Sequence, residues 1–144
     1  MDYYIRIAKI HDAEGIARLS HSALGYDYAI ESTAEKLNAI LFNARDQVFV
    51  AEINNLVVGY IHASVYDVLY APTMVNIMGL AVSPDYRHIG IGRSLIESVV
   101  QWGKSIGACA IRLNSGAARK EAHSFYRHCG FIGEKEQLRF TKPL

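Results

Sequence analysis

The sequence predicts a single α/β (α+β) domain, residues 1–144, with a mixed, mostly antiparallel central sheet and about four flanking helices. Short apolar runs alternate with longer segments whose apolar residues recur every three or four positions. The pair Asn54-Asn55 separates two apolar runs, as in a tight β-hairpin. A long helical pattern connects the runs 75–82 and 109–114, and a crossover of this kind makes two strands parallel.

The N-terminal elements each have a local signal. A strand is expected over 3–7, where apolar and polar positions alternate, and a helix is expected from Asp12, which is a good N-cap, up to Gly25. The segment 32–35 has the S-x-x-E form of a capping box, which predicts a second helix through Asn43.

The remaining elements follow from the same patterns. A loop with Ala71-Pro72 leads to the central apolar run, and Gly107 is placed to end the long helix. The expected elements are strands 47–53, 56–66 and 75–82, a helix 92–106, a strand 109–114, a helix 118–128 and a last strand near 137–141.

Composition narrows the classes of function. The chain is 51% hydrophobic and 20% charged with a formal charge of +1, so no basic excess points to nucleic acid. No apolar run approaches the ~20 residues of a membrane span, and the N-terminal stretch is not a secretory signal. Cys109 and Cys129 are expected to be small core residues in a reducing compartment. We therefore expect a cytoplasmic protein.

Two glycines lie in the short segment from Arg87 to Gly92, here called the glycine turn, between a strand and a helix. No Lys-Ser or Lys-Thr pair follows, as a P-loop needs, and Leu95 stands where a dinucleotide fingerprint has its third glycine. The remaining interpretations are an anion site made by backbone amides at the helix start, or a tight turn that binds nothing.

The wider motif is more specific. Arg87, Gly90 and Gly92 match the pattern [QR]-x-x-G-x-[GA], and the segment 80–86 directly before them belongs to the same motif region. Further along the chain, 122–131 has the form A-x-x-x-Y-x-x-x-G-F. This combination resembles the GNAT acetyltransferases, compact bacterial members in particular. The common family pattern has Asn where this chain has Arg119, and one branch of the family has the S-G-x-x-R-x-x-A-H form found here. Two roles for Arg119 stay open: a contact to CoA, or a cap on the strand 109–114.

The resemblance implies a GNAT fold, with the parallel strands splayed so that acetyl-CoA enters between them. His123 and His128 are five residues apart, which does not suit a helical metal pair, so we expect no required metal. Backbone amides of the glycine turn would hold the pyrophosphate, and strand 75–82 would bond the pantetheine arm. The cofactor-binding residues implied are Leu80, Ala81, Val82, Arg87, His88, Ile89, Gly90, Ile91, Gly92, Arg93, Ser94, Asn114 and Arg119. Tyr126 would be the catalytic acid that protonates the departing thiolate.

The implied activity is acetyl transfer to a primary amine of a small molecule or peptide by direct attack through a tetrahedral intermediate. The alternative is a non-catalytic domain of the same fold that binds or senses acyl-CoA. By analogy a homodimer is expected. Glu52, His62 and Asp67 are candidates for a general base, which stays unassigned, and Tyr26, Asp27, Tyr28, Glu31, Tyr66 and Tyr70 are candidates for the acceptor pocket.

Overall fold

Five strands form one mixed sheet in the order β1-β2-β3-β4-β5. The strands are β1 (Tyr4–Ile7), β2 (Asp46–Ile53), β3 (Leu56–Val68), β4 (Ala71–Val82) and β5 (Ile111–Arg112). Neighbours are antiparallel except β4 and β5, which are parallel, so the predicted mixed sheet with one parallel pair is confirmed. The computed structural model describes residues 2–133 and 135–144, and the chain divides into two compact units, 1–113 and 114–144.

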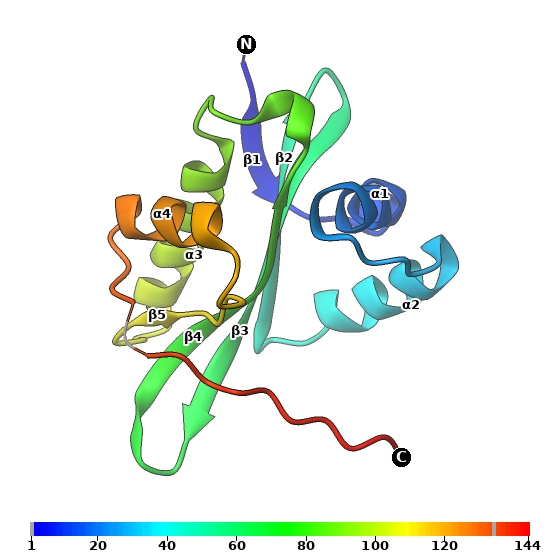
Figure 1. Ribbon diagram of the computed structural model, residues 1–144. Helices are drawn as coiled ribbons and strands as arrows, with labels where there is room; N and C mark the ends of the chain where they lie inside the picture. Colours follow the sequence, from blue (N-terminus) through cyan, green and yellow to red (C-terminus); the bar gives the residue numbers. More distant parts are fainter. Residues whose placement is uncertain (1, 134) are drawn as a thin grey trace. The chain divides into compact units, whose positions relative to one another are not determined.

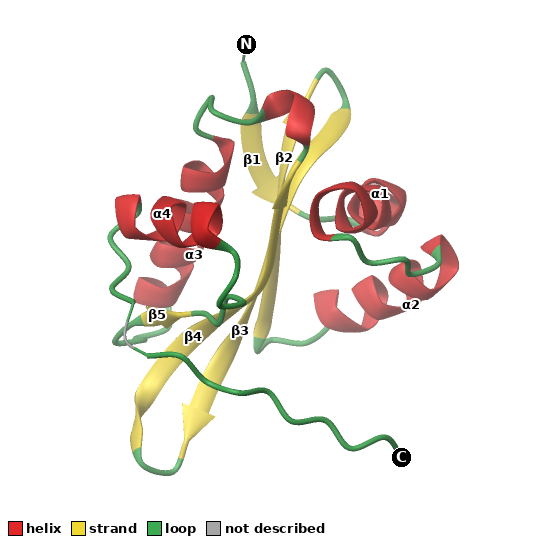
Figure 2. Cartoon of the chain, in the orientation of Figure 1, coloured by secondary structure: helices red, strands yellow, loops and turns green. Residues whose placement is uncertain are grey.

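Helices cover both faces of the sheet in the first unit. Helices α1 (Ala13–Leu24) and α2 (Ile30–Leu41) pack on one face, and α3 (Ile91–Ser105) packs on the opposite face (Figure 1). Two single-turn 3₁₀ helices, η1 (Ile10–Asp12) and η2 (Pro84–Tyr86), lead into α1 and toward α3. The second unit contains α4 (Lys120–His128), followed by irregular backbone (Figure 2).

The core has a layer on each side of the sheet. Ile16, Leu19 and Leu37 of the two early helices pack with Val50 and Tyr60 on one side. On the other side, α3 approaches β3 at Gly59, where an added Cβ would lie 3.0 Å from the Ile91 side chain and 3.2 Å from that of Leu95. A glycine at this position therefore allows the start of α3 to sit close against the sheet.

Local turn signals in the sequence predicted several boundaries correctly. Asn54 and Asn55 both have positive φ (48° and 65°), as a two-residue hairpin turn of type I′ requires. Gly25 and Gly107 adopt left-handed backbone next to the ends of α1 and α3, with φ of 76° and 78°. Each is a helix terminator of the expected kind.

Other expectations were wrong. Helix α2 begins at Ile30, so the expected capping box lies inside it, and the Thr33 hydroxyl donates to the Ala29 carbonyl instead. Strand β4 begins at Ala71, with Pro72 inside it, because β3 continues to Val68 and supplies a partner strand that far. Both errors concern where an element begins, because helix extension and strand pairing override the local sequence signal for that boundary.

The C-terminal expectations also need correction. Strand β5 has two residues instead of six, and it pairs with β4 only at Val75 and Asn76. Residues 137–141 are irregular and exposed, without the expected strand. Cys109 is exposed and Cys129 half-buried, so the expected burial of both thiols in the core was wrong. Within the described residues, no helix has the length and apolarity needed to cross a bilayer.

Candidate active site

The glycine turn connects β4 to α3 with two residues in left-handed backbone, His88 (φ 66°) and Gly90 (φ 94°). Gly90 is the N-cap of α3, and the first intrahelical bond runs from the Ser94 amide to the Gly90 carbonyl, at 3.0 Å. The amides before Ser94 therefore precede the helical hydrogen-bond ladder, and no side chain caps them. The first turn holds no acidic residue, so its field favours an anion.

Two hydrogen bonds hold the backbone around the start of α3. The hydroxyls of Tyr3 and Ser94 are hydrogen-bonded at 2.8 Å. A Cβ on Gly90 would lie 3.3 Å from the same Tyr3 hydroxyl, which makes this position tight as well as left-handed. Arg87 is exposed, and its Nε donates to the Val82 carbonyl at 3.3 Å, which bridges the turn to the end of β4.

Strand β4 changes its pairing pattern just before the glycine turn. On the β3 side, His62 pairs with Gly79 and Ala63 with Ile77, so Met78 is the extra residue of a β-bulge. On the β5 side, the described pairing ends at Asn76. Leu80, Ala81 and Val82 thus pair with β3 on one edge, while their other edge lies beyond the paired part of β5. Backbone groups along such an edge can bond an extended ligand.

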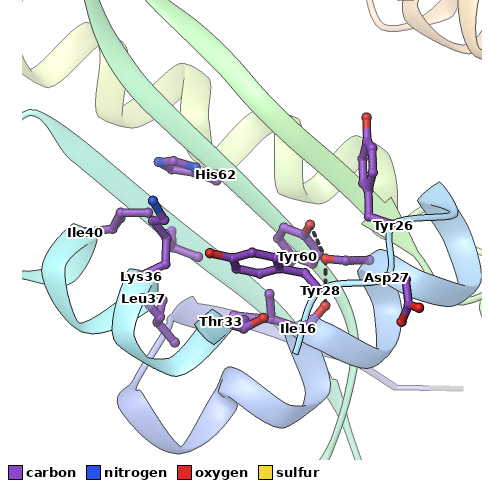
Figure 3. A pocket seen from close by; sticks show the side chains of 12 residues that line it. Ile16, Tyr26, Asp27, Tyr28, Thr33, Lys36, Leu37, Ile40, Tyr60 and His62 are labelled. Carbon is purple, nitrogen blue, oxygen red and sulfur yellow. Dashed lines mark hydrogen bonds between the residues drawn. The ribbon is translucent and has the colours of Figure 1, made fainter. Parts of the chain in front are cut away.

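A pocket of about 420 Å³ lies between the two early helices and strands β2 and β3, here called the α1–α2 pocket. Its lining side chains are mostly apolar or aromatic: Ile16, Ser20, Tyr26, Asp27, Tyr28, Thr33, Lys36, Leu37, Ile40, Val48, Tyr60 and His62 (Figure 3). The Tyr28 ring extends across the pocket, whereas the Asp27 carboxylate is directed away from that ring (Figure 3).

Some polar groups of this pocket are hydrogen-bonded within the protein. The Tyr60 and Ser20 hydroxyls are 2.8 Å apart, and Ser20 also donates to the Ile16 carbonyl. Burial raises the pKa of Tyr60, and the Ser20 hydrogen bond offsets only part of that rise. Of the predicted pocket residues, Tyr66 and Tyr70 lie elsewhere: Tyr66 stacks under the Arg112 guanidinium at 4.2 Å, and Tyr70 is 84% exposed. Glu31 is not among the lining residues either.

The three candidate bases have different surroundings. Glu52 accepts hydrogen bonds from Tyr4 and Arg6, and these two donors, the first above all, lower its pKa. Asp67 is exposed and accepts from Thr73 and Arg45, which likewise lower its pKa.

His62 is the one candidate base that lines the α1–α2 pocket. Its Nε2 lies 2.8 Å from Oδ1 of Asp46, a residue that the sequence did not single out. A pair formed between residues 16 apart depends on strand register, so no local pattern marks it.

The second unit carries Tyr126 on α4. Its ring packs near the rings of Phe125 and Phe131, with centroids 5.5 and 5.8 Å away. Burial raises the pKa of Tyr126, although the charge of Arg119 opposes that rise. The phenol therefore keeps its proton well above neutral pH, as an acid that must donate requires. Arg119 occupies the N-cap position of α4, and Asn114 begins the unit. No three potential metal ligands gather anywhere in the described ranges.

Comparison with known proteins identifies the family of this chain. Residues 12–131 match the model of the Acetyltransferase (GNAT) family, so the chain belongs to that family. The N-alpha-acetyltransferase of Sulfurisphaera tokodaii is 28% identical over 138 residues, which cover 90% of this chain and 80% of the relative.

Solved structures share the fold. An aminoglycoside acetyltransferase from an uncultured soil metagenomic sample, in complex with trehalose, aligns with a TM-score of 0.85 and 24% identity over 99% of this chain and 96% of the other. An aminoglycoside N-acetyltransferase in complex with CoA aligns with a TM-score of 0.88 and 18% identity over the same shares. The family match and the curated relative support acetyltransferase activity, and the solved structures support the fold.

Proposed function

We propose that the protein is an acetyl-CoA-dependent N-acetyltransferase that acts on a primary amine of a small molecule or peptide. The observation that carries this proposal is the glycine turn, where left-handed His88 and Gly90 precede the uncapped start of α3. Left-handed backbone at a non-glycine residue is costly and tends to persist where a ligand site needs it. Amides at such a helix start suit the diphosphate of coenzyme A.

The proposed roles follow the chain. Amides from Arg87 to Ser94 hold the pyrophosphate, and the backbone of residues 80–82 bonds the pantetheine arm along the edge of β4 that lies beyond the paired part of β5. The Leu80 amide, next to the bulge, stabilises negative charge on the acetyl oxygen during transfer. Asn114 and Arg119 are proposed as further cofactor contacts, and Tyr126 as the acid that protonates the leaving thiolate.

The α1–α2 pocket is proposed as the acceptor site. Its walls are largely aliphatic and aromatic, Lys36 is a cation, and the Asp27 carboxylate is directed away from the Tyr28 ring (Figure 3). A pocket with this lining favours an amine with an apolar or aromatic body, because a polycation would lose hydration there without gaining matching carboxylates.

Binding and turnover test the proposal separately. Acetyl-CoA should raise the melting temperature and bind with measurable heat in calorimetry, and thiol release should follow when amines are added. Tight binding of acetyl-CoA without transfer to any amine would favour a non-catalytic acyl-CoA sensor. Greater stabilisation by ATP or NAD than by CoA would contradict the proposed cofactor.

A further inference from the structure

Asp46 and His62 form a hydrogen-bonded pair across two strands. In the register of β2 and β3, His62 lies opposite Val48, two residues from Asp46, so the pair are diagonal neighbours on one face of the sheet. Their side chains are 12% and 21% exposed, and the Nε2–Oδ1 distance is 2.8 Å. The imidazole is therefore shielded, held by a carboxylate, and placed in the wall of the α1–α2 pocket.

This contact fixes which imidazole nitrogen carries the proton. A carboxylate oxygen only accepts hydrogen bonds, so Nε2 is the donor, and in the neutral ring Nδ1 is the nitrogen with a lone pair. Across residues 2–133 and 135–144, the structure gives His62 no second hydrogen-bond partner. Nδ1 is therefore left to accept a proton from a molecule in the pocket.

His62 also lies at the bulge of β4. It pairs directly with Gly79, the residue that follows Met78, and a Cβ on Gly79 would lie no closer than 3.8 Å to the Tyr60 hydroxyl. The residue opposite His62 therefore has no side chain, and it is next to the backbone that the proposed function assigns to the acetyl group.

We propose that His62, oriented by Asp46, is the general base of acetyl transfer, an inference that rests on the proposed function. Nδ1 takes one proton from the ammonium group of the acceptor, and the neutral amine nitrogen then forms a bond to the acetyl carbon, which gives a tetrahedral intermediate. The carbon–sulfur bond breaks when this intermediate collapses. The sulfur leaves as a thiol after Tyr126 protonates it, and the second amine proton restores the Tyr126 hydroxyl through solvent. His62 releases its proton to water, which completes the cycle.

The proposal predicts a pH dependence. A protonated imidazole cannot accept a proton, so kcat/KM for the amine should be lower in acidic than in alkaline buffer. Asp46 on β2 is bonded to it, and the other titratable groups that line the pocket are Lys36 on α2, Tyr60 on β3, and Tyr26, Asp27 and Tyr28 from the segment before α2. Asp46 is a positioning residue, because it acts through the imidazole.

The test compares His62→Gln and Asp46→Asn with His21→Gln, a change at an exposed histidine on α1 outside the pocket. A benzylamine acceptor and saturating acetyl-CoA are used from pH 6 to 10. His62→Gln should lower kcat/KM for the amine by about 10²-fold or more at pH 7. The deficit should shrink toward pH 10, where the amine loses its proton unaided. Acetyl-CoA affinity and melting temperature should stay near wild type, and His21→Gln should behave as wild type.

Asp46→Asn should give a smaller loss, and imidazole ¹⁵N NMR should report Nε2–H in wild type and a shift of the proton toward Nδ1 in this variant. A His62→Gln deficit under threefold, or one that is equal at every pH, would overturn the assignment of the base while leaving the proposed function intact. A wild type that binds acetyl-CoA but acetylates no amine would overturn both.

Discussion

Replacing Gly90 by alanine tests the central claim about the glycine turn. Gly90 has a φ of 94° at the N-cap of α3, where an added Cβ would lie 3.3 Å from the Tyr3 hydroxyl. Left-handed backbone costs an L-residue about 1–2 kcal/mol. Because residues 87–90 are exposed, the unliganded variant can relax there to relieve this strain, but a bound diphosphate would require the original backbone. We therefore expect most of the cost to appear in the binding of acetyl-CoA.

The expected loss of affinity is about 5- to 30-fold, since each 1.4 kcal/mol changes a Kd tenfold. Calorimetric titration of acetyl-CoA measures this Kd, and chemical unfolding measures stability. Gly107→Ala is the matched control: its φ is 78°, nothing lies within 4 Å of an added Cβ, and it follows the other end of α3. That control should lose about 1 kcal/mol of stability with its Kd unchanged. An unchanged Kd in Gly90→Ala, with a stability loss equal to that of the control, would refute an amide-based diphosphate site.

Three other outcomes are expected. Tyr126→Phe should lower kcat by about 10²-fold or more, with acetyl-CoA affinity within a few-fold of wild type. The control Tyr70→Phe, at an exposed ring, should leave kcat unchanged. If Tyr126→Phe had the same kcat as wild type, Tyr126 would be excluded as the acid. Among amine acceptors, benzylamine should have a higher kcat/KM than kanamycin, and the reverse order would contradict the apolar acceptor class. Burial alone would raise the pKa of Asp12, but hydrogen bonds from Arg6 and the Lys9 amide outweigh it and hold that pKa below its ordinary value. This stabilisation is present above about pH 4, which is the pKa of an aspartate in the unfolded chain, and it is lost as the pH falls through the lower pKa of Asp12 in the folded protein. Urea unfolding should therefore find Asp12→Asn less stable than wild type at pH 7, with the difference shrinking at pH 3; a constant difference would contradict the ion pair.

Features that depend on local backbone chemistry could be predicted from the sequence. Two asparagines between apolar runs predicted the β2–β3 hairpin, and Gly25 and Gly107 predicted where helices end. In each case the residue type itself favours the φ value that the turn needs. The glycine turn belongs to the same group, which is why its place between a strand and a helix was predicted correctly.

Features that depend on pairing between distant segments could not be predicted. Asp12 is the N-cap residue of α1 as expected, but its carboxylate makes no capping hydrogen bond to that helix. It accepts instead from the Arg6 guanidinium, which also donates to Glu52 on β2. No spacing in the sequence reports that β1 and β2 are neighbours. The short extent of β5 is similar, because its length is set by where it diverges from β4.

The bulge at Met78 explains why alternation in the sequence could not predict which residues of β4 lie on the face of α1 and α2. Residues paired across antiparallel strands share a face, so Asn76, opposite Ser64, lies on the face of α1 and α2. Regular alternation would continue this face through residues 78, 80 and 82. The extra residue shifts the alternation by one position. Gly79 and Ala81 therefore lie opposite His62 and Tyr60, and Leu80 turns to the face of α3. Gly79, which has no side chain, thus lies opposite His62 where Met78 would otherwise lie, and Ala81 lies opposite Tyr60 in place of Leu80. On this face of β4 the proposed base therefore has a glycine opposite it instead of a long side chain.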